Sequence, residues 1–282
     1  MKKVKIDGVS QLIPERWEEC TEEQIQQLLP LQLVVLNEQE PQSRGRLKNA
    51  ALRVLFPMVK KFEKDLLPEQ LWALGQLTRW IWEKRLTHKP FESFEFEGVD
   101  YLLPDDNFSN TTAIEIAMAN IHYLAYTRPE NPNPRAVLQL VTTLCRPVRK
   151  DLKSFRKSAD WNGDAREEYN TILADERAGR MTTLGLGVVM GVLQYFEAMN
   201  SRFVSMYREV YEPDPDAADL PPLYAGGEGL VTTLMEIAKT GTFGDFDKVC
   251  KQNGHTVWLF LKDTNLKIAR AKVLAEQAEE NE

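Results

Sequence analysis

The sequence is poor in the residues that build disulfide frameworks and metal sites. Only three cysteines and three histidines occur among its 282 residues. The cysteines lie far apart and form no Cys-x-x-Cys motif, which argues against both a disulfide framework and a zinc site. No histidine has a second histidine or a carboxylate at a metal-ligand spacing such as His-x-x-x-His. We therefore expect reduced thiols, no metal and no cofactor.

Long hydrophobic runs are also missing. The longest apolar candidate, residues 184–196, is interrupted by Gln194 and is shorter than the roughly 20 residues that a membrane-spanning helix needs. The N-terminus turns polar after a few residues and has neither a hydrophobic signal core nor a small-residue cleavage site. We expect a soluble, cytoplasmic protein that does not bind a membrane.

Positive charge is in deficit. The formal net charge is −7 and the pI is about 5.3. Such a chain is poorly suited to bind nucleic acid non-specifically, because phosphate contacts need clustered lysine and arginine. We expect no nucleic-acid partner. Hydrophobic residues make up 43% and charged residues 27%, which is ordinary for a globular protein.

A proline-free stretch at 181–211 organises the chain. Its apolar residues recur at steps of three and four, which places them on one face of a long helix. They are Val189, Leu193, Phe196, Met199, Phe203, Met206 and Val210. The first turns, 184–193, are apolar on all sides and are expected to be buried all round. Gly187 and Gly191 suit a close contact with another element of the core.

Helical patterns on both sides of this stretch predict a mainly α protein, a multi-helix bundle around the central helix. Thr21 and Gln24 form the capping-box pattern at the start of one helix. The clearest β signal is 94–102, where alternating residues flank a glycine and predict a small hairpin. A lone hairpin is marginal in water, so we expect this one to pack on helices or to pair with a strand at 4–6.

Proline-rich breaks set the expected domain boundaries. Residues 1–212 are predicted to form the main α-rich domain, with a candidate sub-boundary near 128–134. Residues 213–229, rich in proline, glycine and acidic residues, predict an exposed linker. Residues 230–282 are then a C-terminal helical segment.

One basic run occurs in this acidic chain, formed by Arg146, Arg149, Lys150, Lys153, Arg156 and Lys157. On a helix, most of these side chains would fall on one side. That side is either a docking surface for an acidic partner or a solvated face balanced by the acids that follow. The candidate partner-binding residues are Arg146, Arg149, Lys150 and Lys153.

Recognisable catalytic or ligand-binding motifs are missing. Asp160–Asp164 resembles the opening of a calcium loop, but Ala165 and Thr171 stand where that loop needs a glycine and a carboxylate. The glycine-rich stretch 226–229 follows no strand and lacks the Gly-Lys-Ser/Thr of a phosphate loop. A catalytic site assembled from distant residues would leave no such motif, so an enzyme stays an alternative.

Tryptophans cluster at Trp72, Trp80 and Trp82. They suggest either a ligand-stacking surface or core residues plus one exposed ring, and the second interpretation is favoured.

Three segments together resemble a family. They are Tyr123–Tyr126 through Leu144–Pro147; Asn162–Asn170 followed by the apolar helix at 187–196; and Gly241–Phe246 with His255–Val257. Their order resembles proteins of tailed phages and prophages, especially of Bacteroidetes, that are encoded among tail-morphogenesis genes. Some of these proteins are called tail assembly chaperones. The resemblance spans roughly residues 111–270.

The resemblance implies a non-enzymatic chaperone or morphogenesis factor that binds another tail protein in the cytoplasm of the bacterial host. The tape-measure protein is a candidate partner. The resemblance implies no cofactor and no catalytic residues, and it leaves the oligomeric state open. Two alternatives come from other classes: a structural tail or connector component of the virion, and an enzyme with a dispersed site.

Overall fold

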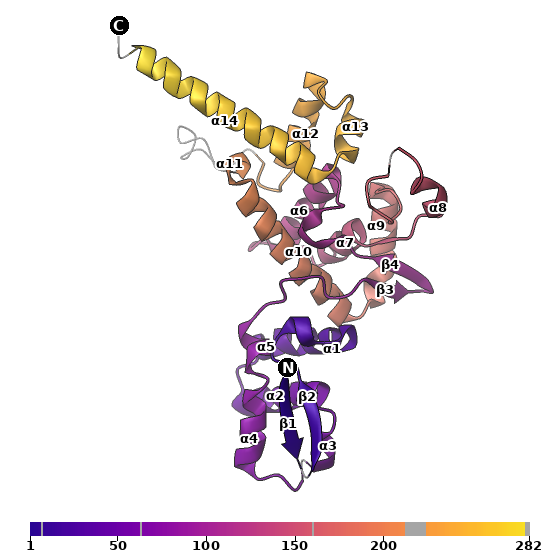
Figure 1. Cartoon of the computed structure of the whole chain (residues 1–282), viewed down its shortest axis with the longest axis vertical. Coiled ribbons are helices and arrows are strands. Elements are labelled where there is room, and N and C mark those ends of the chain that lie inside the picture. The colour runs from indigo at the N-terminus through magenta and orange to yellow at the C-terminus, as the bar shows by residue number, and fades with distance from the viewer. Residues whose placement is uncertain (7, 63, 160, 212–223, 280–282) are drawn as a thin grey trace. The chain divides into compact units, whose positions relative to one another are not determined.

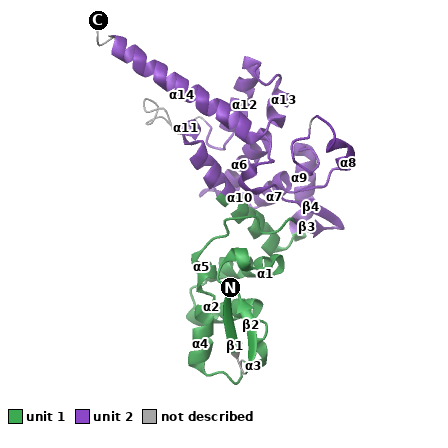
Figure 2. Ribbon diagram, viewed as in Figure 1, with its two compact units in different colours: residues 1–92, 183–198 green, residues 93–182, 199–282 purple. Residues whose placement is uncertain are grey.

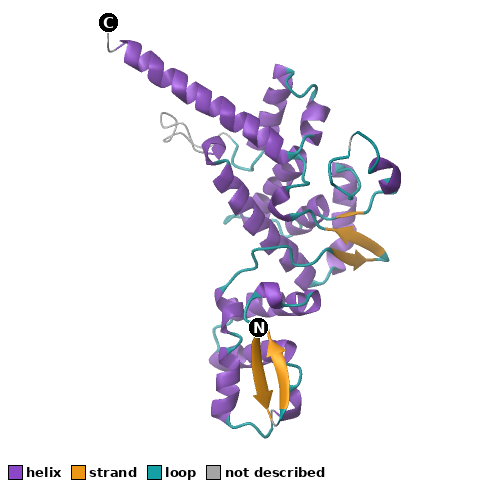
Figure 3. Ribbon diagram, viewed as in Figure 1, coloured by secondary structure: helices purple, strands orange, loops and turns teal. Residues whose placement is uncertain are grey.

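The computed structural model describes residues 1–6, 8–62, 64–159, 161–211 and 224–279 (Figure 1). This part of the chain is mainly helical and contains two small antiparallel sheets, one of two strands and one of three (Figure 3). The mainly α fold class with a small β element is thereby confirmed.

The chain divides into two compact units (Figure 2). Unit 1 consists of residues 1–92 and 183–198, and unit 2 of residues 93–182 and 199–282. This division replaces the boundaries expected from the sequence. The C-terminal helices are not a separate segment, because α12 (Gly229–Thr240) and α13 (Phe246–Lys251) pack against α6 (Ala113–Thr127) of unit 2. Most of the expected linker at 213–229, namely residues 213–223, lies outside the described residues.

Unit 1 opens with a hairpin that the sequence showed only in part. Strand β1 (Lys2–Ile6) pairs with β2 (Val9–Ile13), a strand that was not expected. The remaining elements are η1 (Trp17–Glu19), α1 (Glu22–Asn37), α2 (Pro41–Leu55), α3 (Val59–Phe62), α4 (Pro68–Gln76), α5 (Arg79–Glu83) and the first part of α10 (Leu186–Met206).

Helix α1 begins where its capping residues predict. The Gln24 amide donates to Thr21 Oγ1 at 3.2 Å, and the Thr21 amide donates to Gln24 Oε1 at 3.0 Å. This reciprocal pair satisfies two amides that have no partner inside the helix. Helix α10 crosses α1 closely, since a Cβ added at Gly187 would lie 1.9 Å from the Gln26 carbonyl oxygen. The close core contact expected at this glycine is thereby confirmed.

The central helix is shorter than expected. Residues 181–183 form the 3-10 turn η3 (Met181–Thr183), α10 runs over Leu186–Met206, and α11 (Arg208–Tyr211) follows after a break. Residues 187–196 are buried, as predicted, but Leu186 is 48% exposed. Two glycines precede or enter the first turn, and glycine lowers the stability of a helix interior by roughly 1 kcal/mol relative to alanine. The start of the helix therefore lies later than the apolar pattern alone suggests.

Unit 2 contains the hairpin predicted at 94–102. Strand β3 (Ser93–Phe96) pairs with β4 (Val99–Leu102), and the turn residues Glu97 and Gly98 both have positive φ, 51° and 76°. The hairpin does not pair with the N-terminal strand. Its partner is β5 (Arg146–Pro147), which pairs with Leu102 and Tyr101. Strand β5 could not be predicted from an alternating pattern, because its two residues are too few to show one.

The other elements of unit 2 are η2 (Asp106–Phe108), α6, α7 (Ala136–Leu144), α8 (Leu152–Phe155), α9 (Thr171–Arg180), the end of α10, α11, α12, α13 and α14 (Gly254–Glu279). The base of α14 is held by hydrogen bonds to the loop before α6. The Gly254 amide donates to Thr111 O at 2.9 Å, and Asn253 Nδ2 donates to Ser109 O at 2.7 Å. These bonds attach the N-terminal end of α14 to the loop before α6.

Candidate functional site

The basic run does not form the expected helix. Arg146 lies in strand β5, Arg149 and Lys150 lie in the turn that follows, and only Lys153 lies in the short helix α8. Arg146 is 2% exposed and cannot present its charge at the surface. The prediction that Arg146 belongs to a partner-binding face is therefore wrong. The run does not form a helix because Pro147 has no amide hydrogen to continue one and because β5 pairs with β4.

Arg146 belongs to a buried ion network that the sequence did not reveal. Its guanidinium donates to Glu115 and, at 3.2 Å, to Asp164. Arg166 lies beside it, 3.2 Å from Glu115 and 2.8 Å from Asp164. Glu115 is 0% exposed and Arg166 is 2% exposed. Two cations therefore share two carboxylates inside unit 2.

The network fixes local structure. Arg146 Nε donates to Glu167 O at 2.8 Å, and Arg166 Nη1 donates to Leu144 O at 2.6 Å. Burial acts to raise the pKa of Glu115, but the charges of Arg146 and Arg166 outweigh burial and lower it. The carboxylate is thus held ionised. A permanently paired carboxylate suits structural support better than proton transfer, which needs a group near its own pKa.

The other predicted residues, Arg149, Lys150 and Lys153, remain near the surface. Arg149 donates to Asp151 at 2.7 and 3.1 Å, and its guanidinium lies 3.3 Å from the centre of the Phe155 ring. Lys150 and Lys153 are exposed. A role for these three residues in partner binding remains a prediction.

The outer part of α14 exposes an unusual amount of apolar side chain. Up to Asn265, the helix is tied to unit 2, because Lys262 Nζ pairs with Glu209 at 3.0 Å and Asn265 Nδ2 donates to Glu209 O at 2.9 Å. Residues 265–278 are all exposed. The large apolar side chains among them are Leu266 (50% exposed), Ile268 (53%), Val273 (50%) and Leu274 (56%). We call residues 266–279 the outer α14 segment (Figure 1).

The apolar residues of the outer α14 segment follow helical spacing. One row is Leu266, Ala269 and Val273, and another is Ile268, Ala271, Ala275 and Ala278. Steps of three and four place each row along one side of a helix, as in the seam of a coiled coil. Residues 266–275 carry three cations, Lys267, Arg270 and Lys272, and no acid. The whole segment adds Glu276 and Glu279, so it is apolar with a small excess of positive charge.

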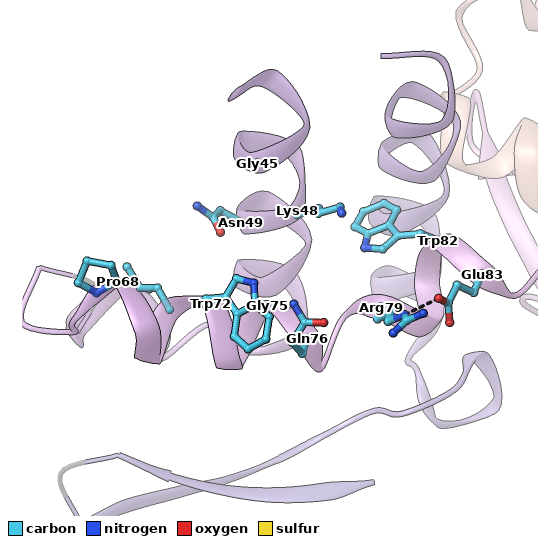
Figure 4. Close-up of a pocket in the computed structure, with 11 residues that line it drawn as sticks. Gly45, Lys48, Asn49, Pro68, Trp72, Gly75, Gln76, Arg79, Trp82 and Glu83 are labelled. Carbon is cyan, nitrogen blue, oxygen red and sulfur yellow. Dashed lines mark hydrogen bonds and ion pairs between the residues drawn. The ribbon is translucent and has the colours of Figure 1, made fainter. Parts of the chain in front are cut away.

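A second surface feature is a groove in unit 1. It has a volume of about 610 Å³ and lies between α2, α4 and α5. Trp72, which is 69% exposed, and the half-buried Trp82 line it together with Lys48, Asn49 and Gln76 (Figure 4). Trp80 is instead a core residue that donates to Pro14 O at 3.2 Å. The favoured interpretation, core plus one exposed ring, holds for Trp80 and Trp72.

Reactive and metal-binding groups are scarce in the part of the chain that the structure describes. Burial and the nearby charges of Glu19 and Glu18 raise the pKa of Cys20 to about 12, and burial and Asp247 raise that of Cys250 to about 11. No group of three or more histidine, cysteine or acidic side chains is arranged to hold a metal within the described residues. Among the same residues, no helix is both long and apolar enough to cross a bilayer.

The outer α14 segment is the feature that sequence reasoning missed. Its helical conformation was predicted, but its exposure was not, since a stretch with as many alanines and leucines as this one is typical of a buried helix. The signal was the grouping of Lys267, Arg270 and Lys272 among those apolar residues. Comparison of the chain with protein-family models, with curated protein sequences and with solved structures finds no match.

Proposed function

We propose that this protein is a non-enzymatic factor of phage tail assembly, a chaperone or related morphogenesis factor, that binds another tail protein through the outer α14 segment. The resemblance of residues 111–270 supports the phage assignment. One observation supports the binding assignment. Four large apolar side chains are each at least half exposed along the part of α14 that follows its contacts with Ser109 and Glu209. Exposed apolar surface of this kind marks interaction sites.

The chemistry of the segment defines its partner. The row Leu266, Ala269 and Val273, at coiled-coil spacing, fits an amphipathic helix laid alongside α14. Among the cations of the segment, Lys267 already pairs with Asp263 at 2.6 Å, whereas Arg270 favours an acidic side chain on that helix. A chaperone of this design would cover an apolar helix of its partner, for which the tape-measure protein is a candidate, until the tail assembles. This role places the protein in the cytoplasm of the bacterial host.

The test is co-expression with the tape-measure protein of the same phage or prophage, followed by measurement of how much of that protein stays soluble and in complex. The disabling variant is Leu266→Gln with Val273→Gln, which keeps helix-forming residues but removes one apolar row. Each side chain is 50% exposed. When the partner covers the exposed half of one such side chain, it contributes roughly half of the 1.5–3 kcal/mol of complete burial. Removing both side chains should therefore weaken binding about 10- to 150-fold.

The matched control is Ile172→Gln on α9, because Ile172 is 69% exposed but lies outside the segment. It should behave as the wild type. Equal solubilisation by the wild type and the double variant would reject the α14 assignment. Analysis of purified particles separates a chaperone from the alternative of a structural component: a chaperone is absent from them, whereas a tail or connector protein is present in fixed copy number.

A further inference from the structure

The groove of unit 1 is lined by aromatic rings and hydrogen-bond donors. Trp72 projects from α4, one turn before Gln76, while Lys48 on α2 points toward Trp82 (Figure 4). The volume of about 610 Å³ lies within the range of about 300–1,000 Å³ that is usual for ligand sites. It is an open groove on the flank of three helices of one unit.

The polar groups of the groove are mostly donors. The side chains of Lys48, Asn49 and Gln76 have no hydrogen-bond partner within the described residues; each offers N–H groups, and the amides of Asn49 and Gln76 also offer one carbonyl oxygen each. The carboxylate of the groove, Glu83, is already paired with Arg79. The groove is therefore better suited to a ligand rich in acceptors than to one rich in donors.

Trp82 adds a donor that lacks an acceptor. Its indole N–H is buried and has no partner in the described part of the chain. A buried donor without an acceptor destabilises the folded state, and such a group in a native structure calls for an explanation. An acceptor supplied by a bound molecule, after a small movement of the side chains around the indole, would remove this destabilisation.

We propose that this groove binds a proline-rich peptide segment in the polyproline II conformation. Such a segment has regularly spaced carbonyl acceptors, few amide donors and flat ring faces, and its conformation is set before it binds. Proline rings would stack on Trp72, and peptide carbonyls would accept from Trp82 and from the donors on α2 and α4. Aromatic-lined grooves recognise proline-rich segments by these contacts. The site is separate from the outer α14 segment and does not depend on the proposed function.

The experiment is a titration of the full-length chain, labelled with ¹⁵N, with an acetylated decaproline peptide while the indole N–H signals are followed by NMR. The sequence contains six tryptophans, so each indole can be assigned by substitution. We expect saturable shifts of the Trp72 and Trp82 signals, while the Trp161 signal stays in place. A Gly-Ser decapeptide, which offers carbonyls but no rings, should cause no saturable shift.

Three variants sharpen the test. Trp72→Ala should weaken decaproline binding more than tenfold, since it removes the stacking surface. Trp82→Phe keeps a ring and removes the donor, so it should weaken binding about 3- to 10-fold, the effect of one hydrogen bond. Trp161→Ala, in unit 2, is the matched control and should bind as the wild type does.

Three results would overturn the proposal. The first two are an unchanged affinity for decaproline in both Trp72→Ala and Trp82→Phe, and equal binding of the Gly-Ser peptide. Saturable binding of adenosine at Trp72 without any binding of decaproline would assign the groove to planar heterocycles instead and would also overturn it. Circular dichroism of each variant verifies that it is folded before its affinity is compared.

Discussion

Substitution of Glu115 by glutamine tests the buried ion network most directly. Glutamine keeps the side-chain length and an acceptor oxygen, so the bond from the Thr112 amide to the Glu115 carboxylate, 2.9 Å long, can persist. The negative charge is lost, which leaves Arg146 and Arg166 to share Asp164 as their carboxylate partner in the network. The four charged residues of the network, Glu115, Arg146, Asp164 and Arg166, are each at most 6% exposed, so water cannot replace the missing carboxylate.

The expected loss is large. Removing one member of a buried ion network destabilises a protein by about 3–5 kcal/mol, because the opposite charge stays buried without compensation. For a unit of this size each kcal/mol lowers Tm by roughly 2–4 °C, so Glu115→Gln should lower the Tm of unit 2 by about 6–20 °C. The assay is thermal unfolding followed by circular dichroism, with hydrogen exchange of α6 amides to locate the effect in unit 2.

The matched control is Glu236→Gln. Glu236 pairs with Lys239 at 2.6 Å, but both side chains are at least 60% exposed. Exposed pairs contribute at most about 1 kcal/mol, so the control should change Tm little. If Glu115→Gln lowers Tm no more than Glu236→Gln does, then the network does not stabilise unit 2 and the reasoning is refuted.

The same network predicts a pH dependence. The pKa of Glu115 is lowered on folding, with burial opposing the shift and the two arginine charges outweighing it. Its contribution to stability is therefore complete above the unfolded pKa of about 4.3 and is lost as the pH falls through the lower folded pKa. Acid titration of the wild type should show this loss, and the Glu115→Gln variant should lack that component.

Two further predictions concern unreactive thiols and tight packing. Because the pKa of Cys20 is raised to about 12 and that of Cys250 to about 11, the thiolate fractions at pH 8 predict that iodoacetamide alkylates Cys20 roughly 2,000-fold and Cys250 roughly 200-fold more slowly in the folded protein than in urea. Mass spectrometry measures the rates, and equal rates would contradict the prediction. Gly187→Ala should destabilise unit 1 by about 1–3 kcal/mol, because the new methyl group would overpack against Gln26 O. In the control Gly185→Ala the new methyl group meets nothing within 4 Å, so stability should not change. Urea unfolding followed by tryptophan fluorescence compares the two variants, and equal unfolding midpoints would refute the packing argument.

Local chemistry determined many of the elements from the sequence alone. The start of α1 follows from Thr21 and Gln24, whose hydrogen bonds involve residues three positions apart. The β3–β4 hairpin follows from strand-forming residues on both sides of Gly98, and the end of α12 follows from Gly241, whose φ is 72°. These features depend on neighbours within a few residues, so a single sequence contains the information that fixes them.

Tertiary structure decided the features that bear on function. Arg146 lies within a run of surface-like cations, yet pairing of β5 with β4 and the carboxylate of Glu115, 31 positions away, place it in the interior. The outer α14 segment has the composition of a buried helix, yet no described element covers it. Burial depends on which distant segments pack against a residue, and helical or strand periodicity identifies a face without identifying what lies against it.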